Sequence, residues 1–124
     1  MRKLTFWTYS EKEIDDLIEP ISKLFNSNDF IRDYENVWEW IVGTSSEFKS
    51  KINISREHDW EKGKYTKPLI FTFDYKGFNK SKTVNTIGNI LAKEFNAEVN
   101  YGELLISSKR DYEQKTKLTF RPDN

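Results

Sequence analysis

Lys51–Trp60, which reads KINISREHDW, is the stretch from which the fold of this chain is most readily interpreted. Its first half alternates as a β-strand does, which places Ile52 and Ile54 on one face. Asn53 and Ser55 then point to the opposite face. Its second half is a compact group of charged and aromatic residues that contains the only histidine of the chain. The stretch therefore predicts a strand with one buried face that ends in a polar cluster.

The segments on both sides of this strand predict an α+β domain. Alternating apolar residues predict further strands, and helical spacing predicts two helices. Besides the strand at 48–55, the expected strands are 3–9, 35–42, 68–75, 98–107 and 115–121, and the expected helices are 10–25 and about 83–95. The order is thus β-α-β-β-β-α-β-β, while residues 30–34 fit either a loop or a turn of helix. Because short polar turns join most strands, we expect a mainly antiparallel sheet with both helices packed on one face.

Each expected helix has a sequence feature that needs a structural explanation. Ser10 stands at the expected N-cap of the first helix, and Glu13 three residues later completes a capping box. Pro20 cannot donate a backbone hydrogen bond inside this helix, so it predicts a kink or a division into two short helices. Gly88 lies on the apolar stripe of the second helix. Close packing of that helix against the sheet would explain why a glycine stands there.

Length and composition predict one domain, 1–124, without disulfides or a bound cofactor. The chain has no cysteine, which excludes disulfides, thiolate metal sites and a cysteine nucleophile. No recognised spacing of metal ligands and no nucleotide-binding motif is present, so neither a metal nor another cofactor is expected. No segment has the apolar length of a signal peptide or a membrane span. These features predict a cytoplasmic protein that does not contact a membrane.

The charged residues are unevenly distributed, although the formal net charge is zero. Residues 11–47 include 10 acidic and 3 basic residues, a net charge of −7, whereas residues 48–124 include 15 basic and 10 acidic residues, a net charge of +5. An acidic surface attracts a basic protein partner and accelerates association, and exposed tryptophans anchor such interfaces. The residues predicted on these grounds to bind a partner are Glu11, Asp15, Glu19, Asp29, Asp33, Glu35, Glu39, Trp38 and Trp60. The alternative is an uneven set of solvated side chains without a partner.

The strand expected at 35–42 bears directly on this prediction. Trp38, Trp40 and Val42 alternate with Val37, Glu39 and Ile41. Burying both faces of this strand would cover the Glu39 carboxylate. We therefore expect one of its faces to be partly exposed.

His58 suggests an enzyme as the alternative function. With Arg56 and Glu57 it could act as the general base of a metal-free nuclease. Neighbouring residues of a strand point to opposite faces, however, so these three side chains converge only if the strand has already ended. A lone histidine at a strand end is more often hydrogen bonded and packed.

The lysines of residues 62–82 suggest a second alternative, a nucleic-acid-binding module. Lys62, Lys64, Lys67, Lys76, Lys80 and Lys82 are interleaved with Tyr65, Tyr75 and Phe78, a combination suited to phosphate contacts and base stacking. The zero net charge and the acidic first third favour two solvated lysine-rich loops instead. No nucleic-acid partner is expected.

Asn53–Trp60, with the sequence NISREHDW, resembles an N-I-S-R-x-H-x-W stretch of small bacterial immunity proteins that accompany polymorphic and contact-dependent growth inhibition toxins. The similarity extends over residues 35–106. It includes Val37–Trp40 before the motif, Pro68–Ile70 after it, and Ile87-Gly88, Leu91-Ala92, Val99 and Tyr101-Gly102 further on.

This resemblance implies a cytoplasmic protein without enzymatic activity that binds a cognate toxin domain, often a nuclease. It would neutralise the toxin by occluding its active site. The motif residues Arg56, His58 and Trp60 would then be structural and would hold the strand end. The acidic residues would contact the toxin and could mimic the phosphates of its nucleic acid.

Overall fold

The computed structural model describes residues 2–58, 66–75, 79–107, 109 and 111–123. Within these residues, seven strands and two helices follow one another. Their bounds are β1 Arg2–Thr8, α1 Ile14–Leu24, β2 Ile31–Glu35, β3 Trp38–Ser45, β4 Ser50–Glu57, β5 Leu69–Tyr75, α2 Lys80–Phe95, β6 Val99–Ile106 and β7 Tyr112–Phe120.

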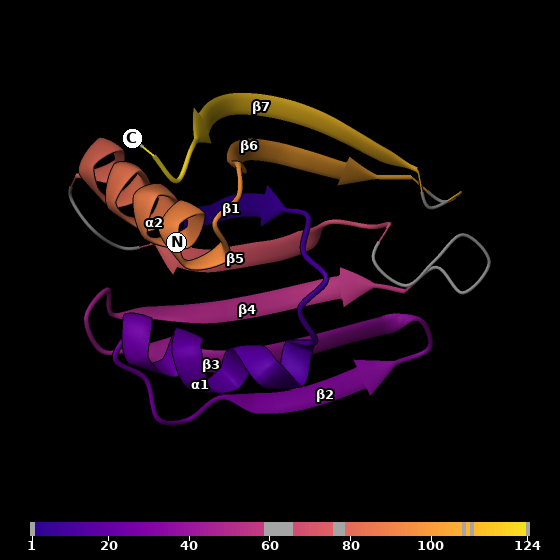
Figure 1. Cartoon of the computed structure of the whole chain (residues 1–124), viewed down its shortest axis with the longest axis horizontal. Coiled ribbons are helices and arrows are strands. Elements are labelled where there is room, and N and C mark those ends of the chain that lie inside the picture. The colour runs from indigo at the N-terminus through magenta and orange to yellow at the C-terminus, as the bar shows by residue number, and fades with distance from the viewer. Residues whose placement is uncertain (1, 59–65, 76–78, 108, 110, 124) are drawn as a thin grey trace.

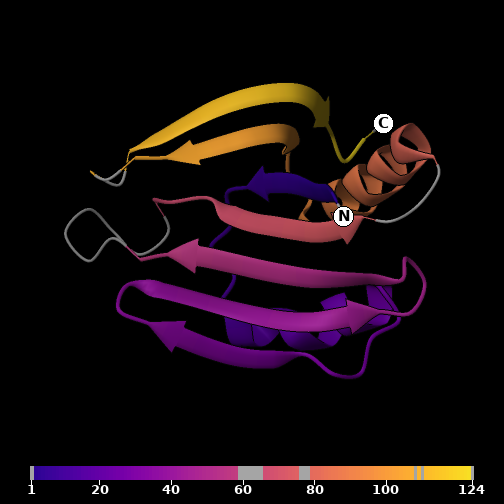
Figure 2. The same cartoon turned by 180° about the vertical axis from the view of Figure 1, so that it is seen from behind.

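The strands form one sheet in the order β2-β3-β4-β5-β1-β6-β7, and every neighbouring pair is antiparallel. Both helices lie on the same face of this sheet, in front of it in Figure 1 and behind it in Figure 2. The predicted fold class, an antiparallel α+β sheet with two helices on one face, is therefore confirmed. One strand, β2, was not predicted, because residues 30–34 have no alternating apolar pattern.

β1 lies in the middle of the sheet, between β5 and β6. Since all neighbours are antiparallel, β5 and β6 run in the same direction, and α2 connects them by crossing over the helix-covered face. α1 similarly carries the chain from β1 to β2 at the edge of the sheet (Figure 1).

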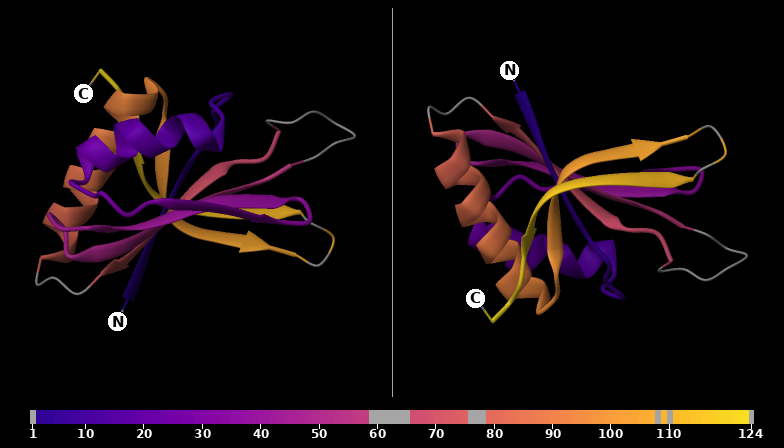
Figure 3. Two further views of the ribbon diagram at one scale, coloured as in Figure 1. Left: turned by 90° about the horizontal axis from the view of Figure 1, so that it is seen from below. Right: turned by 90° about the horizontal axis from the view of Figure 1, so that it is seen from above.

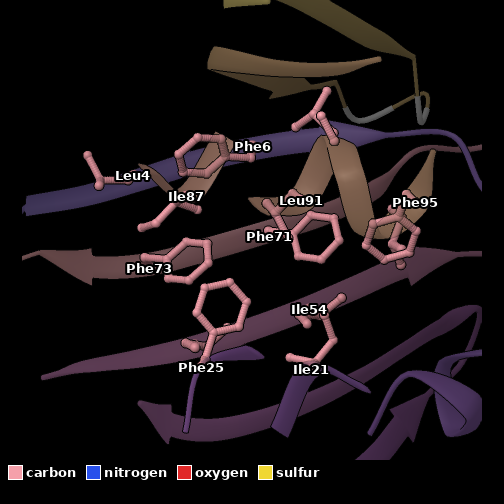
Figure 4. Packing of buried hydrophobic residues seen from close by; sticks show 14 of the residues in the cluster. Leu4, Phe6, Ile21, Phe25, Ile54, Phe71, Phe73, Ile87, Leu91 and Phe95 are labelled. Atoms are coloured by element: carbon pink, nitrogen blue, oxygen red, sulfur yellow. The ribbon is translucent and has the colours of Figure 1, made fainter. Parts of the chain in front are cut away.

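The hydrophobic core fills the space between the helices and the sheet (Figure 4). β1 contributes Phe6, whose ring lies against that of Phe73 on β5, and Phe71 of β5 lies against Phe95 of α2. α1 adds Ile21 from its buried face. Gly88 of α2 confirms the expected close packing, because a Cβ at this position would lie 2.3 Å from the ring of Phe120 on β7.

α1 begins at Ile14, so the predicted start at Ser10 with a capping box is wrong. The N-cap is Glu13, which forms no side-chain capping hydrogen bond. The physical reason is a tertiary contact: Arg56 donates hydrogen bonds to the carbonyl oxygens of Ser10 and Lys12, at 2.9 Å each. The helix then runs without a break through Pro20 to Leu24, so it is not divided in two.

The β6–β7 hairpin reaches across the face of the sheet that carries no helix, here called the open face. The strand register shifts between Tyr101 and Gly102, which bends the hairpin. Gln114 of β7 accepts a hydrogen bond from the indole of Trp7 at 3.0 Å, and this tryptophan is fully buried. Figure 3 shows the resulting twist, with the turns of the β6–β7 and β2–β3 hairpins directed to the same end of the sheet.

Candidate functional site

A cluster of charged side chains is buried on the helix-covered face, where β3 and β4 meet α1. Its centre is Glu39 of β3, which is 3% exposed. Oε1 of Glu39 lies 2.6 Å from Nε2 of His58 and accepts a hydrogen bond from Arg56 at 3.3 Å. Oε2 accepts a hydrogen bond from Arg32 of β2 at 3.2 Å, and Arg32 also forms an ion pair with Asp15 of α1. The cluster therefore connects β2, β3, β4 and α1.

Arg56 is the most deeply buried charge of this cluster, with no exposed surface. Burying a guanidinium is costly unless it is paired and hydrogen bonded. Glu39 supplies the opposite charge, and the carbonyl groups of Ser10 and Lys12 supply two further acceptors. Arg56 thus fixes the chain that leads into α1 against the end of β4.

Glu57 lies on the opposite face of the sheet from Arg56 and His58, as strand alternation requires. Its carboxylate is also buried, and it accepts a hydrogen bond of 2.6 Å from the hydroxyl of Tyr112 on β7. Arg56, Glu57 and His58 consequently do not converge on one point. His58 and Glu39 do line a pocket of about 290 Å³ together with Arg32 and Tyr34.

The open face presents two half-buried tryptophans at its β2 end. Three rows of side chains lie side by side there: Asp33 and Glu35 on β2, Trp40 and Trp38 on β3, and Ser55 and Glu57 on β4. We call the set Asp33, Glu35, Trp38, Trp40, Asn53 and Ser55 the tryptophan face. A pocket of about 250 Å³ is lined by five of these residues, all except Asp33, and by Asn36.

The uneven charge of the sequence becomes an uneven charge of the molecule. Residues 11–47 build α1, β2 and β3, which lie together at one end of the sheet (Figure 1) and are here called the acidic end. Its exposed carboxylates are Glu11, Asp15, Asp16, Glu19, Asp29, Asp33, Glu35 and Glu47. The opposite end, built from α2, β6 and β7, exposes the cations Lys80, Lys82, Lys93, Lys115, Lys117 and Arg121 and fewer carboxylates, among them Glu98, Glu103 and Glu113.

Asp29 stabilises the local structure of the acidic end through hydrogen bonds. Its carboxylate accepts hydrogen bonds of 2.8 Å from the backbone N–H of Thr44 and from the hydroxyl of Ser27. These bonds, the first of them above all, hold the pKa of Asp29 below its ordinary value. They fix the segment between α1 and β2 against β3.

The predicted site residues differ in where they lie. Glu11, Asp15, Glu19, Asp29, Asp33 and Glu35 are exposed at the acidic end, and Trp38 is half-buried on the tryptophan face. Glu39, by contrast, is buried and lines the pocket beside His58. Arg56 and His58 are buried and hydrogen bonded, an arrangement that fits a structural role. Trp60 lies outside the described residues, as do Lys62, Lys64, Tyr65, Lys76 and Phe78 of the lysine-rich loops.

Of the other lysine-rich-loop residues, Lys67 places its ammonium 5.0 Å from the ring centre of Tyr112, whereas Lys80 and Lys82 lie in the first turn of α2. No group of three or more acidic or histidine side chains among the described residues is arranged to hold a metal ion. Neither α1 nor α2 is long and apolar enough to cross a membrane, and these are the helices of the described residues.

Comparison of the chain with protein-family models, with characterised proteins and with solved structures finds no match. The arrangement of its own residues is therefore the basis for assigning a function.

Sequence reasoning missed one part of this site, the pairing of acids with tryptophans. Asp33 and Glu35 become neighbours of Trp40 and Trp38 only because residues 31–35 form the edge strand β2. The available signal was Asn36, which has a positive φ of 55° and follows the acidic pair directly. Asparagine tolerates this conformation and commonly marks tight turns between strands.

Proposed function

We propose that this chain is a binding protein of the immunity type, which neutralises a bacterial toxin domain by covering its active site. The observation that carries this proposal is the acidic end, where exposed carboxylates of α1, β2 and the turns around them gather on one part of the surface. Such a surface is complementary to a basic protein, and many nucleases are basic where they hold nucleic acid. The chain itself would act in the cytoplasm without catalysis.

The buried cluster supports this proposal because it joins the elements of the acidic end to one another. Glu39, Arg56 and Arg32 hold β2, β3, β4 and α1 in one arrangement before any partner arrives. A surface that is already ordered loses little conformational entropy on binding, so more of the contact energy appears as affinity. A tight inhibitor needs this property.

The test is co-expression of the full chain with the C-terminal domain of a toxin-like gene encoded beside it. We expect a stoichiometric complex and restored growth of the host cells. The absence of both complex and protection, for every such neighbouring domain, would contradict the proposal.

The role of the acidic end is tested with the triple variant Glu11→Lys, Asp16→Lys, Glu19→Lys. These positions avoid Asp15, whose ion pair with Arg32 belongs to the buried cluster. Association with the toxin should slow, and its dependence on salt should flatten. The matched control is the reversal Lys80→Glu, Lys82→Glu on α2, at the other end of the molecule. Equal association rates for both variants would show that the acidic end is not part of the interface with the toxin.

A second candidate function, a metal-free nuclease, is favoured by one observation. Nε2 of His58 lies 2.6 Å from a Glu39 oxygen, and both residues line the pocket that also contains Arg32. A histidine oriented by a carboxylate can act as a general base, and an arginine beside it can bind a phosphate. Here Arg32 would replace Arg56 in the role of the phosphate-binding cation.

His58→Gln tests the nuclease directly. The purified chain is incubated with single-stranded RNA in the presence of a chelator, and the variant is compared at equal folded fraction. Cleavage that disappears with His58→Gln and with Arg32→Gln would favour the enzyme. RNA that stays intact with the unmodified chain, or cleavage that survives His58→Gln, would exclude it.

A further inference from the structure

The tryptophan face has a composition that matches one kind of ligand group. Asp33 stands directly opposite Trp40, and Glu35 directly opposite Trp38, in the antiparallel pair β2–β3. Residues directly opposite in such a pair have Cβ atoms about 4.5–5.5 Å apart and share one face. Each tryptophan ring therefore has a carboxylate beside it.

The carboxylate of Asp33 accepts one hydrogen bond, of 2.8 Å, from the backbone N–H of Tyr34. Among the described residues, the side chains of Trp38, Trp40, Asn53 and Ser55 form no hydrogen bond with another side chain or with the backbone. The indole of Trp7 differs, because Gln114 of the β6–β7 hairpin satisfies it. Tyr112 of this hairpin contacts Glu57, next to Trp38 of β3, and a pocket of about 250 Å³ remains on the tryptophan face.

The negative charge of this face is also uncompensated. Among the described residues, neither Asp33 nor Glu35 forms an ion pair. The nearest arginine along the chain, Arg32, points to the opposite face of β2, where it pairs with Asp15 and Glu39. An uncovered pair of carboxylates next to aromatic rings repels phosphate and attracts a cation.

We propose that the tryptophan face binds an arginine side chain of the toxin partner, with the guanidinium stacked on Trp38 or Trp40 and hydrogen bonded to Glu35 or Asp33. This inference rests on the proposed binding function and names the chemistry of its contact. Arginine fits better than lysine, because its planar guanidinium stacks on an indole and donates two parallel hydrogen bonds to one carboxylate. The pocket next to Glu35, with its volume of about 250 Å³, has room for such a group.

The tryptophan face and the acidic residues of the α1 segment lie on different sides of the sheet. Asp16 and Glu19 lie on α1 and Glu11 precedes this helix, on the helix-covered side of the molecule, whereas the tryptophan face lies on the open side of β2 and β3. A partner that contacts both would wrap around the β2 edge. α1 would then mainly accelerate the encounter, and the tryptophan face would hold the docked complex.

The experiment uses the full chain labelled with ¹⁵N and a peptide probe, GRGRGRG, with acetylated and amidated ends. The indole N–H signals of Trp38 and Trp40 should shift and saturate on titration, while the indole signal of Trp7 should stay in place. The same peptide with citrulline for arginine has nearly the same shape without the charge, and should produce no saturable shift. Equal shifts with both peptides, or none with the arginine peptide, would overturn the inference.

The double variant Asp33→Asn, Glu35→Gln should weaken peptide binding about two- to fivefold, as the loss of an exposed carboxylate contact predicts. The control is Asp74→Asn, on the same face but in β5, which should bind as the unmodified chain does. Unchanged binding by the double variant would contradict the inference.

If the chain protects cells from a toxin but this variant forms the complex equally well, the inference fails and the immunity function stands. If the peptide binds and no toxin complex forms, the immunity function fails, and only the preference of the tryptophan face for arginine side chains stands.

Discussion

Oε1 of Glu39 lies 2.6 Å from Nε2 of His58, inside the protein and between strands β3 and β4. The same oxygen accepts a hydrogen bond from the fully buried Arg56. Glu39→Gln would keep the shape of the side chain but remove the negative charge that Glu39 places beside the guanidinium. We expect a loss of about 3–5 kcal/mol in the free energy of unfolding, since removing one partner of a buried ion pair leaves an uncompensated charge. Urea unfolding followed by tryptophan fluorescence measures it.

The matched control for this variant is Glu11→Gln, because Glu11 is exposed. Exposed substitutions of this kind usually change stability by less than about 0.5 kcal/mol. If both variants unfolded at the same urea concentration, the buried cluster would contribute nothing to stability.

Tyr112→Phe removes the hydroxyl that donates to Glu57, a contact that joins β7 to β4 across the open face. A hydrogen bond to a charged group contributes about 1.5–3 kcal/mol, so we expect a loss in this range. Amide hydrogen exchange should accelerate most in residues 103–107 and 112–116 of the hairpin. Tyr34→Phe is the control, because Tyr34 is 69% exposed on β2. Identical exchange in the two variants would show that the hairpin is held by other contacts.

Gly88→Ala tests the packing of α2 on β7. Helix propensity alone favours alanine by about 1 kcal/mol. The added Cβ would lie 2.3 Å from two ring atoms of Phe120 and 2.6 Å from the atom that joins the ring to its chain, so the whole ring would have to move. Overpacking of this kind costs about 1–3 kcal/mol, and we therefore expect net destabilisation in thermal unfolding.

Asn85→Ala, an exposed position on the same helix, gives the propensity effect without the steric conflict. Phe120→Leu should reduce the penalty of Gly88→Ala in a double-mutant cycle. A stabilised Gly88→Ala would mean that helix and strand are further apart than the structure has them.

Asp29 should titrate below the ordinary pKa of an aspartate, because the backbone N–H of Thr44 and the hydroxyl of Ser27 stabilise its charged form. A carboxyl whose pKa is lower in the folded than in the unfolded protein stabilises the fold above its unfolded pKa. That contribution is lost as the pH falls through the folded pKa. The side-chain carbon signal of Asp29, followed by NMR against pH, gives the value. Ser27→Ala should raise the pKa of Asp29 towards the ordinary value of an aspartate. If this pKa did not change, the hydrogen bond from Thr44 alone would account for the shift.

Much of the fold was predictable because it depends on local patterns. Strand alternation, as in Ile52 and Ile54 of β4, and helical spacing, as in α2, predicted most of the elements. β2 was missed because all its side chains are exposed, so its sequence carries no alternation between apolar and polar residues. Its pairing with β3 comes from backbone hydrogen bonds, which leave no trace in the sequence.

The candidate site was less predictable because it depends on contacts between distant residues. Glu39 was expected at the surface, since a carboxylate is normally buried only when paired. Its partners Arg56 and His58 are 17 and 19 residues away, and their approach depends on the register of β3 and β4. Arg56 also contacts the carbonyl groups of Ser10 and Lys12, and α1 therefore begins at Ile14 rather than at the predicted Ser10.

The central place of β1 also has a consequence for synthesis on the ribosome. β1 is made before both of its neighbours, β5 and β6, which follow at Leu69–Tyr75 and Val99–Ile106. Until then the apolar side chains of Leu4, Phe6 and Trp7 have no strand beside them. The meander β2-β3-β4 can pair locally much earlier. The nascent chain therefore carries β1 as an unpaired aromatic segment while the acidic end is already assembling. At this stage we expect a chaperone to bind the β1 segment.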